Sequence, residues 1–248
     1  MTAPTTRKCP VCFNNCPKKF DFVERVEDEQ RIICKECGAI YFTRRPPVAL
    51  KYDSTYNSYF LRPGDISKAG LMAAAIGEFC KNTLRNPAIL EVGCGNALTL
   101  FLLRQQGYAV KGLEPDPAWC LKIVESLNIP MIIGTFEEAD IKEKYDMIYS
   151  SHTIEHCEDP HVWFNKAFEL LNPGGYFWID TPDSYYHDKQ LGRWHHFETR
   201  HQFEHVCILS DDAVKHLARK YFFHIVKCER QPEYQSLSVI LQKPFAGR

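Results

Sequence analysis

The 248-residue sequence lacks the features of several specialised protein classes. No apolar run reaches the ~18 residues that a membrane-spanning helix needs. The N-terminus, MTAPTTRKCPVC, has no apolar signal-peptide core. Neither sign of charge is in excess, with 30 Lys and Arg against 31 Asp and Glu, which disfavours a phosphate-backbone binder. With 45% hydrophobic and 25% charged residues, the sequence predicts an ordinary folded protein in the cytoplasm.

Cysteine is abundant, but its distribution does not fit a disulfide framework. The total of eleven is odd, and no export signal accompanies it. Five cysteines fall within the first 37 residues, which is typical of metal ligands. The other six are scattered singly, and we expect them to be small buried hydrophobic residues. These six are Cys80, Cys94, Cys120, Cys157, Cys207 and Cys228.

Two CxxC pairs, Cys9/Cys12 and Cys34/Cys37, stand 21 residues apart. Each pair turns two thiolates toward one point, and two pairs complete a tetrahedral four-sulfur site that suits Zn²⁺. Four cysteines leave no open coordination position, so we expect a structural zinc in a zinc ribbon. The segment between the pairs predicts a hairpin with Phe20, Phe22 and Val26 alternating and a turn at 27–30. Cys16 is left over and is expected to be a buried thiol.

From residue 86 onward, short apolar runs alternate with amphipathic stretches, which predicts β/α units around a parallel sheet. The expected strands are 88–92, 109–114, 130–134, 145–150, 175–180, 223–228 and 236–242. The expected helices are 66–85, 98–106, 117–127, 160–171 and 213–221. A helix stop and turn is predicted at 172–175, and Ser210 is predicted to cap the helix that follows it.

A glycine turn, Gly93-Cys94-Gly95-Asn96-Ala97, follows an apolar strand that ends in Glu91 and opens a helix at Leu98. Glycines let the backbone turn sharply and approach a ligand closely. A second strand ends in Glu114, 23 residues after Glu91. A carboxylate at that place accepts hydrogen bonds from both ribose hydroxyls of an adenosine ligand. Leu98 stands where a nicotinamide dinucleotide site carries its third glycine, so an adenosyl cofactor without a pyrophosphate fits better.

This segment resembles the first motif of class I S-adenosylmethionine-dependent methyltransferases, of the small-molecule type related to ubiquinone-pathway methylases. The resemblance covers about residues 48–248, and later segments match the family's pattern in the expected order. These are Tyr145-Asp146-Met147-Ile148, then 150–156 with Asp159-Pro160, then 171–182, and finally Glu204-His205 before Leu209-Ser210. The resemblance implies a Rossmann-like α/β fold with a seven-stranded sheet and helices on both faces.

The resemblance also implies the cofactor, S-adenosylmethionine, and the residues around it. Glu91 is expected near the methionine end, and Glu114 on the ribose. The other expected cofactor-binding residues are Gly93, Cys94, Gly95, Pro115, Thr135, Phe136, Ser151 and Tyr59. Two positions depart from the family's pattern. Ala97 replaces a third glycine, the smallest change possible, which is tolerable if that position keeps a negative φ. Gly134-Thr135-Phe136 replaces an acidic adenine contact, which backbone amides and Phe136 are expected to supply.

If the methyl acceptor is a hydroxyl, a base must take its proton, and histidine is the usual choice near neutral pH. The catalytic candidates are His152, His195 and His196. The last two lie in a stretch rich in aromatic residues and histidines that covers the acceptor in the resembled family. His156 and His205 each follow a glutamate and are interpreted as architectural. A tyrosine-rich stretch around Tyr52, Tyr56 and Tyr59 is expected to form either a lid over the cofactor or part of the core.

The predicted organisation is a zinc ribbon at 1–45 and a class I methyltransferase domain at 46–248, with a lid and helix at 46–85 and an acceptor-covering loop at 181–209. The predicted reaction is methyl transfer to a small molecule such as a sugar or a quinone-like metabolite. Two alternatives stay open: an RNA methyltransferase whose ribbon binds substrate, and a non-catalytic cofactor-binding partner module. Residues 1–45 carry nine Lys and Arg against six Asp and Glu, and a zinc tetrathiolate reduces this surplus by about two, which disfavours RNA.

Overall fold

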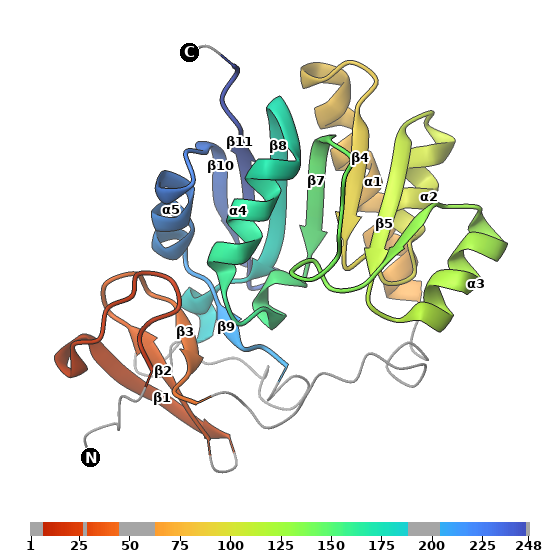
Figure 1. Cartoon of the computed structure of the whole chain (residues 1–248). Coiled ribbons are helices and arrows are strands. Elements are labelled where there is room, and N and C mark those ends of the chain that lie inside the picture. The colour runs from red at the N-terminus through yellow and green to blue at the C-terminus, as the bar shows by residue number, and fades with distance from the viewer. Residues whose placement is uncertain (1–6, 27–28, 45–62, 188–203, 247–248) are drawn as a thin grey trace. The chain divides into compact units, whose positions relative to one another are not determined.

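The computed structural model describes residues 7–26, 29–44, 63–187 and 204–246 (Figure 1). Contacts divide the chain into two compact units. Unit 1 comprises residues 1–50, 152–168 and 179–242, and unit 2 comprises residues 51–151, 169–178 and 243–248. The N-terminal cysteines therefore belong to the same unit as the C-terminal part of the chain. The predicted boundary at residue 45 remains a prediction about sequence modules.

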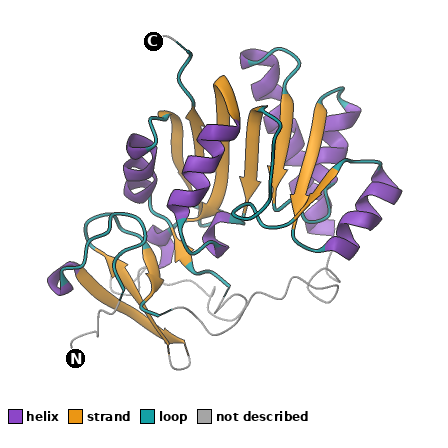
Figure 2. Cartoon of the chain, viewed as in Figure 1, coloured by secondary structure: helices purple, strands orange, loops and turns teal. Residues whose placement is uncertain are grey.

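Strands and helices alternate through most of the described chain, as the secondary-structure view shows (Figure 2). The strands are β1 (Phe20–Val26), β2 (Glu29–Cys34), β3 (Ile40–Phe42), β4 (Ala88–Val92), β5 (Ala109–Glu114), β6 (Met131–Ile133), β7 (Tyr145–Ser151), β8 (Leu171–Pro182), β9 (Cys207–Ile208), β10 (His224–Gln231) and β11 (Ser236–Gln242). The α-helices are α1 (Pro63–Thr83), α2 (Leu98–Gln105), α3 (Pro117–Leu127), α4 (Pro160–Leu170) and α5 (Asp211–Lys220). The short 3₁₀ helices are η1 (Pro17–Lys19), η3 (Ile154–His156) and η4 (Ser184–His187).

A mixed seven-stranded sheet has the order β10-β11-β8-β7-β4-β5-β6. Within unit 2, β4 pairs in parallel with both β5 and β7, so the carboxyl ends of these three strands meet at one edge. Ligands of open α/β sheets bind at that edge. The helix α3 begins there because Asp116 caps it, accepting bonds from the amides of Ala118 and Trp119 at 2.9 and 3.1 Å.

A second, four-stranded sheet has the order β1-β2-β3-β9 and lies entirely within unit 1. Its first three strands come from the cysteine-rich N-terminus, and its fourth, β9, comes from residues 207–208. The pairing of β3 with β9 is antiparallel, with Ile40 opposite Ile208 and Tyr41 opposite Cys207. The N-terminal sheet is thus completed by a distant segment of the chain.

Most of the elements predicted from the sequence are present in the structure. The bounds of β4, β5, α3 and β11 are confirmed exactly, and the Ser210 cap of α5 is confirmed by a 2.9 Å bond from the Ala213 amide. The predicted turn at 172–175 is wrong, because α4 does stop at Leu170 but the chain passes directly into β8. The short strand β9 was not predicted, since two residues carry no periodicity.

Three predictions about the N-terminus are wrong in detail. The hairpin turn does not include Glu29 or Gln30, which lie in β2. A register shift between Phe22 and Glu24 interrupts the alternation, so Val23 is buried while Phe22 is 45% exposed. Cys16 is exposed rather than buried. Of the six scattered cysteines, five are buried as expected and Cys228 is partly buried.

Among the described residues, no helix combines the length and apolar character required to cross a bilayer.

Candidate functional site

The turn between β4 and α2 is built from left-handed backbone conformations. Gly93 and Gly95 have φ of 68° and 50°, which glycine adopts without strain. Ala97 has φ of 54°, so the condition of a negative φ at this position is not met. The left-handed conformation costs an alanine about 1–2 kcal/mol. Burial of its methyl group in the cluster with Leu100 and Ile123 offsets part of that cost.

The glycine turn and the acid at the end of β5 converge in space. The Gly95 amide donates a hydrogen bond to Glu114 Oε2 at 3.2 Å. On its other side, the Gly95 carbonyl accepts a 2.7 Å bond from the Trp119 indole. The sequence prediction required the turn and the carboxylate to meet, and unit 2 brings them within hydrogen-bonding distance.

The two acids of this site are buried and resist ionisation. Glu91 is 6% exposed, and its Oε2 has no hydrogen-bond partner among the described residues. Burial, with a smaller contribution from the charge of Glu114, raises the pKa of Glu91 to about 8. Burial also raises the pKa of Glu114 to about 7, although the Gly95 and Asp116 amides oppose this rise. A buried acceptor without a donor and a second carboxyl beside the turn fit a ligand that brings its own donors and positive charge.

The other predicted cofactor residues lie around the same strand ends of unit 2, with one difference in role. The Cys94 side chain points into the core, where a Cβ on Gly112 would lie only 2.7 Å from its sulfur. Only the Cys94 backbone is therefore available to a ligand. Phe136 is buried, whereas Pro115, Thr135 and Ser151 are half-buried. Tyr59 and the rest of the tyrosine-rich stretch lie outside the described residues, so that prediction stays open.

A second cluster of titratable groups lies in unit 1, beginning one residue after β7 ends. We call Glu155, His152, His156 and His205 the acid–histidine cluster. Glu155 is fully buried, and its Oε1 lies 3.6 Å from His152 Nδ1 and 3.9 Å from His205 Nε2. Its Oε2 accepts a 3.1 Å bond from the Thr181 hydroxyl. Ligand atoms of Glu155, His156 and His205 all lie within 4.8 Å of one another.

The cluster keeps its central acid ionised despite complete burial. Burial by itself raises the pKa of Glu155, but the imidazoles of His152, His156 and His205 outweigh it and lower the pKa to about 2. The backbone of His152 is also unusual, with φ of 50° and its amide bonded to the Asp180 carbonyl at 2.7 Å. A non-glycine residue held in the left-handed region at a strand end is a recurrent feature of functional sites.

The catalytic histidines predicted from the sequence have mixed outcomes. His152 lies in the acid–histidine cluster, and its catalytic role remains a prediction. His195 and His196 lie outside the described residues. Sequence reasoning interpreted Glu155-His156 and Glu204-His205 as architectural and did not bring them together. The repeated Glu-His dipeptide was the available signal in the sequence. Only the tertiary structure shows that His156 and His205 both lie beside the Glu155 carboxylate.

The four predicted metal ligands form one compact group in unit 1. The sulfurs of Cys9, Cys12, Cys34 and Cys37 all lie within 4.8 Å of one another, and none forms a disulfide. The Cys9–Cys37 and Cys12–Cys34 sulfur separations are 3.5 and 3.6 Å. Tetrahedral zinc with Zn–S bonds of about 2.3 Å requires sulfurs about 3.8 Å apart. The donor set therefore fits a closed zinc site, and Cys16 is not part of it.

Sequence comparison gives a consistent result. A family model described as a methyltransferase domain matches residues 67–227. The ubiquinone biosynthesis O-methyltransferase of Azorhizobium caulinodans is 29% identical over 105 residues, covering 40% of this chain and 41% of that protein. The corresponding enzyme of Nitrobacter winogradskyi is 26% identical over 151 residues, covering 56% and 57%. The matched region is thus about two fifths to three fifths of these relatives' length.

Comparison with solved structures shows the fold. A Burkholderia thailandensis 1,6-didemethyltoxoflavin-N1-methyltransferase, solved with S-adenosylhomocysteine bound, has a TM-score of 0.55 at 15% identity and covers 89% of this chain and 98% of its own. A sarcosine dimethylglycine methyltransferase-like structure from Galdieria sulphuraria has a TM-score of 0.55 at 17% identity and covers 73% and 86%. At these identities the similarity establishes a Rossmann-like α/β fold and nothing about substrate.

Proposed function

Because the chain belongs to the methyltransferase domain family, we propose that it is an S-adenosylmethionine-dependent methyltransferase acting on a small-molecule hydroxyl. The observation that carries the proposal is the meeting of Glu114 with the Gly95 amide at the carboxyl end of β4, beside the buried Oε2 of Glu91, for which the described residues offer no partner. The O-methyltransferase relatives support a hydroxyl acceptor. The balanced charge of the chain disfavours RNA, and the intact turn disfavours a non-catalytic module.

The cofactor residues have separable tasks in this proposal. S-adenosylmethionine, when bound, supplies a methyl group activated by a sulfonium charge. Glu114 accepts hydrogen bonds from the ribose hydroxyls, and Glu91 accepts from the methionine end. The Gly93–Gly95 backbone lies close to the ligand because no Cβ intervenes. Burial of both acids excludes water and strengthens their interaction with a cationic ligand.

The acid–histidine cluster supplies the proton acceptor in this proposal. Removal of a hydroxyl proton as the methyl group moves requires a base with a pKa near neutrality. His152 is the candidate, since its side chain is 35% exposed and its Nδ1 faces the ionised Glu155. The buried carboxylate orients the imidazole. The four cysteines hold a structural Zn²⁺ that replaces the core this small module cannot build.

Calorimetric titration with S-adenosylhomocysteine and S-adenosylmethionine tests the cofactor proposal directly. We expect one site per chain. Methyl transfer is then followed with tritiated S-adenosylmethionine and a panel of phenolic and sugar hydroxyl compounds, with RNA as a further acceptor. Absence of calorimetric binding overturns the proposal. Tritium in the RNA alone would show that the chain is an RNA methyltransferase rather than a small-molecule methyltransferase.

Cofactor binding should depend on pH because both acids have raised pKa values. Below pH 7 the carboxyl of Glu114 is protonated, and it must lose that proton to receive the ribose hydroxyls with full strength. Ionisation of Glu114 alone should make S-adenosylmethionine bind about tenfold more weakly at pH 6 than at pH 8, and Glu91 should add to this difference. Net proton release is measured in buffers of different ionisation enthalpy. Glu114→Gln should remove the tenfold contribution of Glu114, whereas the contribution of Glu91, whose pKa is raised to about 8, should remain. Equal affinities at pH 6 and pH 8 would contradict the assignment.

Glu155→Gln tests the acid–histidine cluster. The substitution removes a buried charge that faces the imidazoles of His152 and His205, so we expect a loss of about 2–4 kcal/mol in unfolding free energy at pH 7. Because the folded-state pKa of about 2 lies below the ordinary value, this contribution is present at neutral pH and is lost as pH falls toward 2. Asp140→Asn is the matched control, since Asp140 pairs with Lys142 while 76% exposed. Equal effects of the two variants in urea denaturation would show that the buried cluster carries no special stabilisation.

A further inference from the structure

The cysteine module, defined here as residues 7–44, is joined to the rest of unit 1 by backbone and core contacts. Besides the β3–β9 pairing, Val23, Ile40 and Ile208 form one buried hydrophobic cluster. Arg7 donates a 3.0 Å bond to the Glu158 carbonyl, and the Val11 carbonyl lies 2.8 Å from His161 Nε2. A zinc module that only stabilised itself would not need contacts with the rest of unit 1. The next contacts show that the module holds the segment that carries His205.

Arg31 is a residue of the module that contacts the acid–histidine cluster directly. It is only 8% exposed, and its guanidinium lies 4.5 Å from the centre of the Phe42 ring. Its Nη2 donates a 3.1 Å hydrogen bond to the backbone carbonyl of His205. A buried, stacked guanidinium has few alternative conformations, so its donor fixes the position of the carbonyl that it meets.

The opposite side of the same segment is bound to the cluster. The Val206 amide donates a 2.8 Å bond to the Glu155 carbonyl. The Glu204 carbonyl lies 2.8 Å from His156 Nδ1. Residues 204–208 therefore lie between the cysteine module and Glu155, with the His205 imidazole 3.9 Å from the Glu155 carboxylate. Loss of the module side would leave this segment held from one side only.

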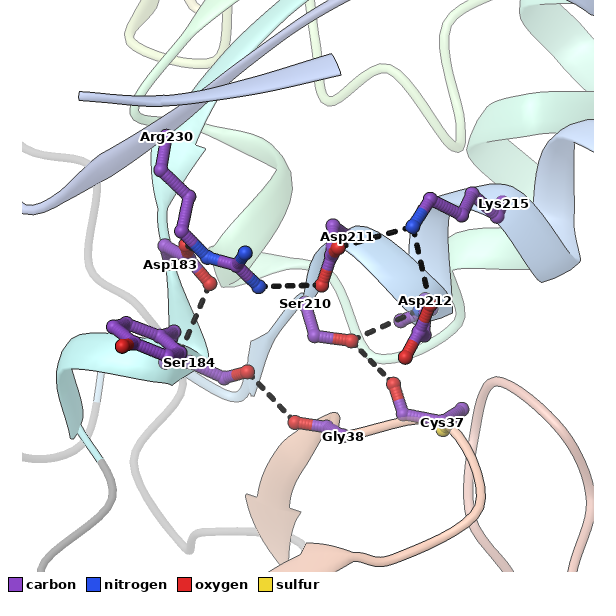
Figure 3. Close-up of polar contacts among 11 residues, drawn as sticks. Cys37, Gly38, Asp183, Ser184, Ser210, Asp211, Asp212, Lys215 and Arg230 are labelled. Carbon is purple, nitrogen blue, oxygen red and sulfur yellow. Dashed lines mark hydrogen bonds and ion pairs between the residues drawn. The ribbon is translucent and has the colours of Figure 1, made fainter. Parts of the chain in front are cut away.

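One predicted metal ligand, Cys37, and its neighbour Gly38 are hydrogen-bonded to the same region, as Figure 3 shows. The Ser210 hydroxyl, which also caps α5, donates to the carbonyl of Cys37. The Ser184 hydroxyl donates a 2.7 Å bond to the carbonyl of Gly38. Ser210 follows β9 by two residues. Ordering of the Cys37 turn by a metal ion would thus order the segment that carries His205.

We propose that the cysteine module is part of the reaction machinery, with Arg31 as a positioning residue that places His205 beside Glu155, and with metal occupancy of the four-cysteine site maintaining that placement. The inference rests on the proposed function, because it requires the cluster to serve in proton transfer and the cysteines to bind zinc. It extends that function because the cysteine module then determines the geometry of the acid–histidine cluster, in addition to stabilising its own fold. Arg31 acts through the His205 backbone and touches no reacting atom.

The test compares the full-length Arg31→Gln and Arg31→Lys variants with wild type. We expect Arg31→Gln to raise amide exchange about tenfold in the peptide that contains Val206 and Cys207. In histidine-labelled protein it should also shift the ring ¹⁵N resonances of His205. Arg31→Lys keeps a cationic donor and should restore much of both signals. Lys35→Gln is the matched control, since Lys35 pairs with Asp21 on the same module at an exposed site.

The metal arm of the test uses the same two signals. Chelation of zinc, followed by mass spectrometry of metal content, should reproduce the effect of Arg31→Gln on the His205 resonances. Binding of S-adenosylhomocysteine is the fold control and should change less than twofold in every variant. Unchanged His205 and Val206 signals in Arg31→Gln overturn the inference. If Arg31→Gln moves the signals but the purified chain holds no metal, the positioning role of Arg31 stands while its metal link and the zinc proposal fail. If S-adenosylhomocysteine does not bind the wild-type protein, the proposed function itself is contradicted.

Discussion

Glu114→Ala should abolish most cofactor binding, raising the dissociation constant of S-adenosylhomocysteine by about 100-fold or more. Two hydrogen bonds between ribose hydroxyls and a carboxylate contribute about 1.5–3 kcal/mol each, and 1.4 kcal/mol corresponds to a tenfold change. The substitution also removes the acceptor of the Gly95 amide, which loosens the turn itself. Isothermal calorimetry at pH 8 measures the effect while the wild-type carboxyl is ionised.

Two further variants separate charge from shape at this position. Glu114→Gln keeps one acceptor oxygen and replaces the other with an NH2 donor, so we expect an intermediate loss of about tenfold. Glu143→Gln removes an equivalent charge from an exposed carboxylate that pairs with Lys111 of β5, and it should leave affinity unchanged. Should Glu114→Ala bind as well as Glu143→Gln does, Glu114 is not the ribose acceptor and the site assignment fails.

Cys34→Ser should release the metal and unfold the cysteine module. A serine hydroxyl is a poor zinc ligand, and a structural zinc contributes about 10–16 kcal/mol to the folding of small zinc modules. We expect metal content to fall from about one zinc per chain to near zero, with early loss of the β1–β3 sheet in amide exchange. The cofactor residues of unit 2 make no contribution to this sheet, so S-adenosylhomocysteine should still bind.

Cys16→Ser provides the control for this experiment. Cys16 belongs to the same module and differs from the four ligands in being exposed and outside the sulfur cluster. It should retain full zinc occupancy, measured both by metal analysis and by the thiolate absorption of the cobalt-substituted protein. Equal metal loss in Cys34→Ser and Cys16→Ser would show that Cys16 is also a zinc ligand and would contradict the four-cysteine site.

Local sequence patterns determined most of the regular elements of this chain. The bounds of β4 and β5 follow from apolar runs that end in Glu91 and Glu114, and α3 follows from Asp116 and Pro117 at its start. These features are encoded within a few residues, so propensity and capping chemistry suffice to place them. The spacing of the two CxxC pairs likewise predicted the sulfur cluster, because each CxxC turn brings two thiols close together within four residues.

Only the tertiary structure decided which of the many histidines share a site. Glu155 and His205 are separated by 50 residues of sequence, and nothing local states that both meet beside Thr181. The left-handed conformation of Ala97 could not be read from the sequence either, since it runs against the preference of alanine itself. The pairing of β3 with the two-residue β9 depends on hydrogen bonds between distant backbones, which no side-chain pattern records. The sequence by itself determined the elements and the cofactor turn, whereas long-range packing decided how the cysteine module meets the acid–histidine cluster.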